Sequence, residues 1–133
     1  MNQQMGFRVV SRPDDWWVLQ GRHPNALITG PRDATHAFLR AITPSLQNPV
    51  RHLDCRTPLD LPTASGTIVL DDVDALSREE QDGLLRWLDA AQCTGSQTIA
   101  LTTVPLYGQV QAGVFLDTLY YRLNVVHLQI VRE

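Results

Sequence analysis

Uniformly apolar runs of five to seven residues recur along the chain and predict buried strands. Such runs, without polar alternation, are typical of strands covered on both faces, as in parallel sheets. Three of them end in glycine, paired carboxylates or paired threonines, and they occupy residues 26–30, 66–72 and 98–103. Two less uniform segments, residues 50–55 and 125–131, are predicted to form further strands.

Between these runs, apolar residues recur at helical spacing. Residues 33–42 and 115–123 each place apolar side chains on one side of a predicted helix. The firmest helix prediction covers residues 77–91, because Ser77 and Glu80 have the spacing of a capping box. Strands that alternate with helices predict an α/β fold, with a mainly parallel five-stranded sheet and helices on both faces. We therefore expect one domain over residues 1–133, with an α/β core at 26–133 and an N-terminal extension at 1–25.

The N-terminal extension carries an adjacent pair of tryptophans, Trp16 and Trp17. Residues 12–24 are predicted to form a short helix, in which this pair covers an edge of the sheet. If the pair were exposed instead, it would form a contact patch for a partner.

All 11 basic residues are arginines, so mechanisms that need a lysine ammonium are excluded. The net charge of −3 and the lack of a basic run disfavour direct binding to DNA. Cys55 and Cys93 have neither the number nor the spacing of a disulfide framework or a zinc site, which predicts free thiols. With no secretory signal and no long apolar run, these features predict a cytoplasmic protein that does not enter a membrane.

In parallel α/β sheets, ligands bind beyond the carboxyl ends of the strands. This rule predicts a ligand-binding edge at the residues that end the three apolar runs. These residues are Gly30, Asp71, Asp72, Thr102 and Thr103.

The order of these segments resembles the AAA+ domain of bacterial enhancer-binding proteins, which activate sigma-54 RNA polymerase. The most specific match is LYYRLNVV at residues 119–126, and the segment at 69–89, VLDDVDALSREEQDGLLRWLD, is similar to the family's acidic strand and following helix. The resemblance covers about residues 26–131 and implies a P-loop NTPase core. The relatives bind ATP with Mg²⁺, and their site corresponds here to Gly30, Arg32, Thr35, His36, Asp71, Asp72 and Thr103.

The phosphate-binding segment departs from the family pattern. A working loop, GxxxxGK[ST], needs a second glycine and a lysine that reaches the phosphates. Thr35 replaces the glycine, and His36, which is shorter and carries little charge at neutral pH, replaces the lysine. Asp33 adds a negative charge that Arg32 offsets in part.

Other family positions have also changed. Asp71 matches the aspartate associated with magnesium, whereas Asp72 replaces the longer glutamate that orients the attacking water. Thr103 stands where the family has a sensing asparagine. Of two arginines that reach a neighbouring subunit's nucleotide, one is Leu116 here and only Arg122 remains.

The family's sigma-contacting loop, GAFTGA, is also missing, because residues 56–65 read RTPLDLPTAS. Since the sequence ends just after the fifth predicted strand, we expect neither the helical lid nor the C-terminal DNA-binding domain of the relatives. We also expect no ring, but a monomer or a small dimer.

Taken together, the resemblance and its departures favour a catalytically inactive AAA+-like regulator without a cofactor. It would act by protein–protein interaction in transcriptional regulation, with an AAA+ activator as the candidate partner. The alternative is a divergent nucleotide-binding protein or weak ATPase, in which Asp71 and Asp72 hold magnesium and Arg32 or His36 stands in for the lysine.

Overall fold

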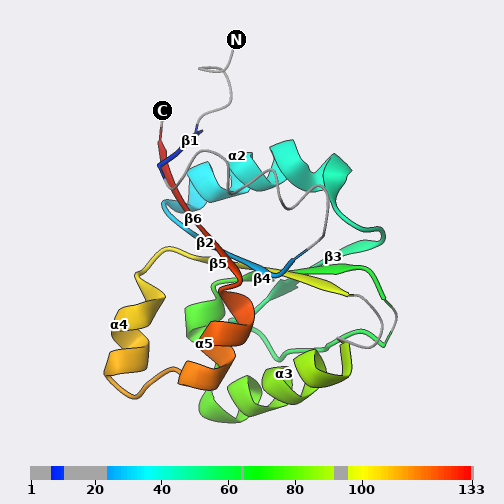
Figure 1. The fold of residues 1–133 in the computed structure, drawn as a ribbon, viewed down its shortest axis with the longest axis vertical. Helices are drawn as coiled ribbons and strands as arrows, with labels where there is room; N and C mark the ends of the chain where they lie inside the picture. Colours follow the sequence, from blue (N-terminus) through cyan, green and yellow to red (C-terminus); the bar gives the residue numbers. More distant parts are fainter. Residues whose placement is uncertain (1–6, 11–23, 64, 92–95, 133) are drawn as a thin grey trace.

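A six-stranded sheet forms the centre of the molecule (Figure 1). The computed structural model describes residues 7–10, 24–63, 65–91 and 96–132. The strands lie in the order β1-β6-β2-β5-β4-β3. Their bounds are β1 Phe7–Val9, β2 Ala26–Thr29, β3 Val50–Asp54, β4 Thr67–Asp71, β5 Gln97–Thr102 and β6 Val126–Arg132.

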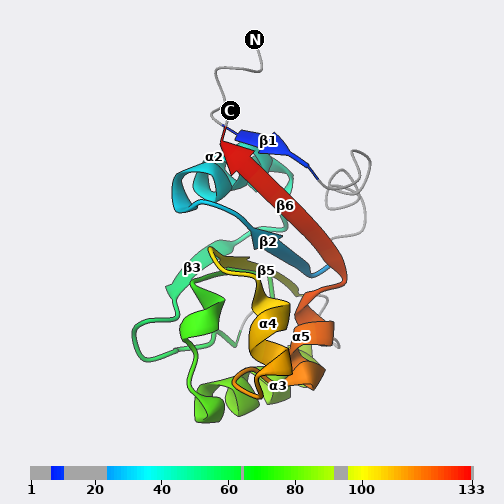
Figure 2. The ribbon, with the colours of Figure 1, turned by 90° about the vertical axis from the view of Figure 1, so that its left-hand side faces the viewer.

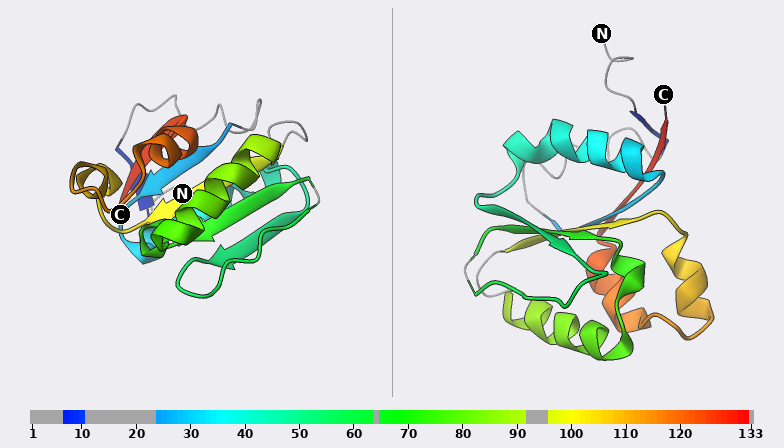
Figure 3. Two further views of the ribbon diagram at one scale, coloured as in Figure 1. Left: turned by 90° about the horizontal axis from the view of Figure 1, so that it is seen from below. Right: turned by 180° about the vertical axis from the view of Figure 1, so that it is seen from behind.

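Helices cover both faces of this sheet and make three layers (Figure 3). One face carries α2 (Arg32–Ile42), and the other carries α3 (Arg78–Ala91), α4 (Leu106–Gln111) and α5 (Asp117–Leu123). Each face has its own apolar core. Phe38, Leu39 and Ile42 of α2 pack in one core, while Leu84 and Leu88 of α3 pack in the other.

The predicted α/β fold with a mainly parallel sheet is confirmed. All neighbouring pairs among β2 to β6 are parallel. The sheet has one strand more than predicted, because β1 of the N-terminal extension pairs antiparallel with β6 (Figure 2). With only three residues, FRV, this strand is too short to display a period. The predicted tryptophan helix lies outside the described residues.

The capping box predicted before α3 is present. The backbone N–H of Glu80 donates to Ser77 Oγ at 3.1 Å, and the backbone N–H of Ser77 donates to Glu80 Oε1 at 3.0 Å. These two bonds satisfy donors that a helix start leaves unpaired, and they fix where α3 begins. The sequence signature missed α4, whose six residues, LYGQVQ, are too few for a helical period. In the part of the chain that the structure describes, no helix is long and apolar enough to cross a membrane.

Candidate functional site

The carboxyl ends of β2 to β5 meet at one edge of the sheet, where the sequence predicts the ligand. Four of the predicted residues come together there: Arg32 and His36 on α2, and Asp71 and Asp72 at the end of β4. They contact one another in two pairs.

The first pair joins Arg32 to Asp72 through two parallel hydrogen bonds. Arg32 Nη1 and Nη2 each donate to one carboxylate oxygen of Asp72, both at 3.0 Å. Only 7% of Asp72 is exposed, whereas nearly half of the Arg32 side chain remains in solvent. The bond to the carboxylate raises the pKa of Arg32 above its usual range. Two-point pairing of this kind fixes both side chains in one geometry.

A second arginine, Arg56, reaches the same carboxylate. Its Nε lies 3.1 Å from Asp72 Oδ2 and 3.1 Å from Asp54 Oδ1. Hydrogen bonding to Arg56 lowers the pKa of Asp54. Asp72 therefore lies between two guanidinium groups, one from α2 and one from the turn after β3.

The backbone at Asp72 has an unusual conformation that aims this carboxylate. Its dihedral angles, φ 56° and ψ 54°, lie in the left-handed region, which aspartate and asparagine tolerate better than most residues. Immediately after it, the Ala75 N–H donates to the Asp72 carbonyl at 2.9 Å and starts a short 3₁₀ turn, Val73–Ala75.

The second pair joins His36 to Asp71. His36 Nε2 lies 2.8 Å from Asp71 Oδ1, and about a third or less of each side chain is exposed. The residue that stands in the lysine's place is thus bonded to the carboxylate that matches the family's magnesium-associated aspartate.

The segment between β2 and α2 has the form of a tight turn rather than a wide loop. Only Gly30 and Pro31 separate the two elements. The Thr35 N–H donates to the Pro31 carbonyl at 2.9 Å, and Thr35 Oγ1 donates to the Arg32 carbonyl at 3.1 Å. Residues 32–36 are therefore the first turn of α2.

Asp33 takes part in a separate, exposed ion pair. Arg132 Nε lies 2.9 Å from both of its carboxylate oxygens, and this hydrogen bond lowers the pKa of Asp33. The contact ties the start of α2 to the end of β6.

Two predicted site residues lie apart from this cluster. Thr103 is exposed and follows the end of β5, whereas its neighbour Thr102 is buried and donates to Asp74 Oδ1 at 3.0 Å. Arg122 pairs with Asp89 of α3, and its carbonyl accepts a hydrogen bond from Asn25, just before β2 begins. Arg122 thus belongs to the opposite end of the sheet from Asp72.

Sequence reasoning missed Asp54 and Arg56. The signal was available, because both flank the end of the predicted strand at 50–55 and the carboxyl-end rule applies to that strand as well. Between them, Cys55 is 2% exposed, and burial raises its pKa to about 12. Its thiol is therefore protonated and is not a nucleophile at neutral pH. Among the described residues, no group of three or more His, Cys, Asp or Glu side chains is arranged to hold a metal ion.

The sigma-54 interaction domain family matches this chain over residues 37–132, and the chain belongs to that family. The matched range begins directly after the Gly30–His36 segment. A search of curated proteins finds no match.

Solved structures share the fold. NtrX from Brucella abortus in complex with ATP is similar with a TM-score of 0.72 and 21% identity, over 92% of this chain and 36% of that one. The ADP complex of the same protein is similar with a TM-score of 0.72 and 22% identity, over 86% of this chain and 33% of that one. RuvB T158V from Thermotoga maritima is similar with a TM-score of 0.63 and 15% identity, over 86% of this chain and 41% of that one. The chain thus spans about a third of the length of NtrX, and these likenesses confirm the P-loop NTPase (AAA+) fold.

Proposed function

We propose that this sigma-54-activator-like domain does not hydrolyse ATP and acts by binding another protein. The observation that carries the proposal is the two-point bond between Arg32 and Asp72, which joins the start of α2 to the end of β4. In a working P-loop site, a lysine and backbone N–H groups hold phosphate there, and a strand-end aspartate serves magnesium. Here His36 and Asp71, which stand at those two positions, bond to each other, and beside them Arg32 is held by Asp72, the replacement for the family's glutamate.

Charge at this edge also supports the proposal. Two guanidinium groups, Arg32 and Arg56, face three carboxylates, Asp54, Asp71 and Asp72. The three carboxylates outnumber the two guanidinium groups, and this excess of negative charge disfavours the approach of a polyanion. For a phosphate to engage Arg32, the guanidinium must leave Asp72, and a nearly buried carboxylate would lose a charged hydrogen-bond partner.

Titration with Mg-ATP, followed by calorimetry and by the melting temperature, tests whether the domain binds nucleotide. We expect no heat of binding and an unshifted melting temperature at millimolar nucleotide. A complete AAA+ domain under the same conditions is the positive control. Dissociation constants below about 1 mM, or roughly −4 kcal/mol, would instead support the alternative of a divergent nucleotide-binding protein. In that case, Arg32→Ala should weaken the binding.

A surface formed by α4 and α5 supports the protein-binding role. Tyr107 of α4 and Tyr121 of α5 are exposed and together define the α4–α5 patch, and Val114 and Val125, before and after α5, are exposed as well. The ring of Tyr120 links two of them, with centroids 5.6 Å from Tyr107 and 5.2 Å from Tyr121. The chain has no charged residue from Ser96 to Leu116. That segment contains Tyr107, whereas α5 carries Asp117 and Arg122 on the same helix as Tyr121. Exposed apolar and aromatic surface is typical of protein contact sites, where tyrosine often contributes strongly.

The candidate partner is a complete AAA+ activator of sigma-54, and its ATPase rate reports binding. We expect this chain to change the rate of such a purified activator in a saturable way. Tyr121→Arg should weaken the apparent affinity by tenfold or more, since contact residues of this kind contribute about 1–2 kcal/mol or more. Ala41→Arg, an exposed position on α2, makes the same change of charge and should have no effect. An unchanged rate at all concentrations, or equal behaviour of both variants, would refute this assignment of partner and surface.

A further inference from the structure

One edge of the sheet is an open strand, β3, and its ladder fixes which backbone groups face outward. In a parallel pair, alternate residues direct both their N–H and C=O groups to the neighbouring strand. The Thr67 N–H donates to the Pro49 carbonyl at 2.9 Å, and the Cys55 N–H donates to the Asp71 carbonyl at 2.9 Å. Odd-numbered residues of this segment therefore bond to β4. Val50, His52 and Asp54 direct their backbone groups away from the sheet.

Two of these three residues keep their outward groups available. The Asp54 carbonyl accepts bonds from the N–H and Oγ1 of Thr57, at 3.0 and 2.8 Å. Within the described residues, no hydrogen bond reaches the outward backbone groups of Val50 or His52. An open edge of this kind can pair with an added strand.

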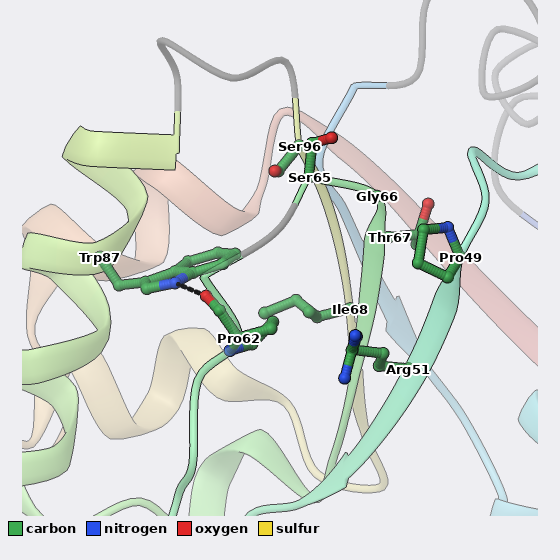
Figure 4. A pocket seen from close by; sticks show the side chains of 9 residues that line it. All are labelled: Pro49, Arg51, Pro62, Ser65, Gly66, Thr67, Ile68, Trp87 and Ser96. Carbon is green, nitrogen blue, oxygen red and sulfur yellow. Dashed lines mark hydrogen bonds between the residues drawn. The ribbon is translucent and has the colours of Figure 1, made fainter.

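The side chains beside this edge add a charge preference. Arg51 points to the face of the sheet that carries α3, where it lines a shallow surface depression with Trp87 and Pro62 (Figure 4). The Trp87 indole N–H donates to the Pro62 carbonyl at 2.8 Å and holds this apolar wall in place. Arg51 is exposed, and no ion pair of its side chain is found in the described part of the chain.

We propose that β3 binds an extended, acidic segment of a partner protein as an additional strand of the sheet. The backbone groups of Val50 and His52 pair with the segment, and Arg51 selects an acidic side chain opposite it. Trp87 and Pro62 offer apolar contact to the neighbouring side chains on the same face. This surface is separate from the α4–α5 patch, and the inference does not depend on whether the domain binds ATP.

The probe is an acetylated and amidated peptide, Thr-Val-Thr-Glu-Thr-Val-Thr, titrated into the labelled full chain by NMR. Its alternation places the valines and the glutamate on one face and the threonines on the other. We expect saturable shifts centred on the Val50 and His52 amides, and slower hydrogen exchange of those amides in the complex. The same peptide with Lys in place of Glu should bind about threefold to tenfold more weakly, because an exposed ion pair is exchanged for a like-charge contact.

A matched pair of variants separates backbone pairing from side-chain contact. His52→Pro removes an outward N–H without breaking the ladder to β4, and proline is tolerated on edge strands in this orientation. His52→Pro should weaken the binding of the peptide about tenfold or more. His52→Ala, which keeps the N–H, should bind the peptide nearly as well as the natural chain does. Arg51→Glu should reverse the preference between the two peptides.

Several results would overturn the proposal. One is an absence of shifts on β3 at millimolar peptide, and another is equal binding by His52→Pro and His52→Ala. A third is a dimer in light scattering that His52→Pro converts to a monomer, because a second copy would then occupy the edge. Circular dichroism and the melting temperature of each variant confirm that it is folded.

Discussion

Replacing Gly30 with alanine should lower the free energy of unfolding by about 3 kcal/mol, whether or not nucleotide is present. A Cβ atom at this position would lie 2.3 Å from the carbonyl oxygen of Ile130, which is a backbone atom of β6. That oxygen cannot move aside easily, because β6 pairs with β2 on one side and with β1 on the other. The Gly30 N–H also donates to the Thr102 carbonyl at 3.1 Å, which holds the glycine in place. Overpacking in such a site costs typically 1–3 kcal/mol, and more where backbone must shift.

Urea denaturation of the two proteins measures this effect, and Gly108→Ala provides the matched control. Gly108 lies in α4, and a Cβ there would meet nothing within 4 Å. Because glycine is a poorer helix former than alanine, the control should gain about 0.5–1 kcal/mol. A Gly30→Ala variant that is as stable as the natural chain would contradict the packing explanation.

The close contact at Gly30 gives this residue a structural role that is independent of nucleotide. The first glycine of a phosphate loop is present, yet close packing between β2 and β6 is sufficient to require it. The retained glycine is therefore not, by itself, an argument that the domain binds nucleotide.

Patterns within single segments were predictable from the sequence. The apolar runs predicted β2, β4 and β5, and the spacing of Ser77 and Glu80 predicted the start of α3. Each of these patterns depends only on residues a few positions apart. The carboxyl-end rule also brought Asp71 and Asp72 to the correct edge of the sheet.

Pairings between distant residues were not predictable in the same way. Arg32 and Asp72 are 40 positions apart in the sequence. Both Arg32 and Arg56 contact Asp72 because the left-handed backbone at that residue directs its carboxylate toward them. Likewise, the bond of Thr102 to Asp74 depends on where β5 ends, and strand ends are poorly defined by periodicity. The family pattern pointed to Thr103 at this position, but the buried contact is made by its neighbour.

The second large effect is expected at Asp72, where Asp72→Asn should lower the free energy of unfolding by about 2 kcal/mol. Asparagine keeps the shape of the side chain and tolerates the left-handed backbone, so the variant removes the charge and replaces one of the two acceptor oxygens with an amide donor. Hydrogen bonds to charged groups contribute about 1.5–3 kcal/mol each when one partner is buried. The arginines remain hydrated after the substitution, since about half of each side chain is already exposed, and this hydration limits the loss.

An exposed ion pair in the same protein serves as the control for this prediction. In the pair between Arg132 and Asp33, about two thirds of each side chain is exposed, so Arg132→Gln should leave the denaturation midpoint unchanged within experimental error. A double-mutant cycle of Arg32→Gln with Asp72→Asn should return a coupling energy clearly different from zero, because both variants break the same contact. If Asp72→Asn were no more destabilising than Arg132→Gln, the Arg32–Asp72 bond would be too weak to compete with a phosphate. Arg32 would then be available to a nucleotide, and the proposal that this domain does not hydrolyse ATP would lose its physical basis.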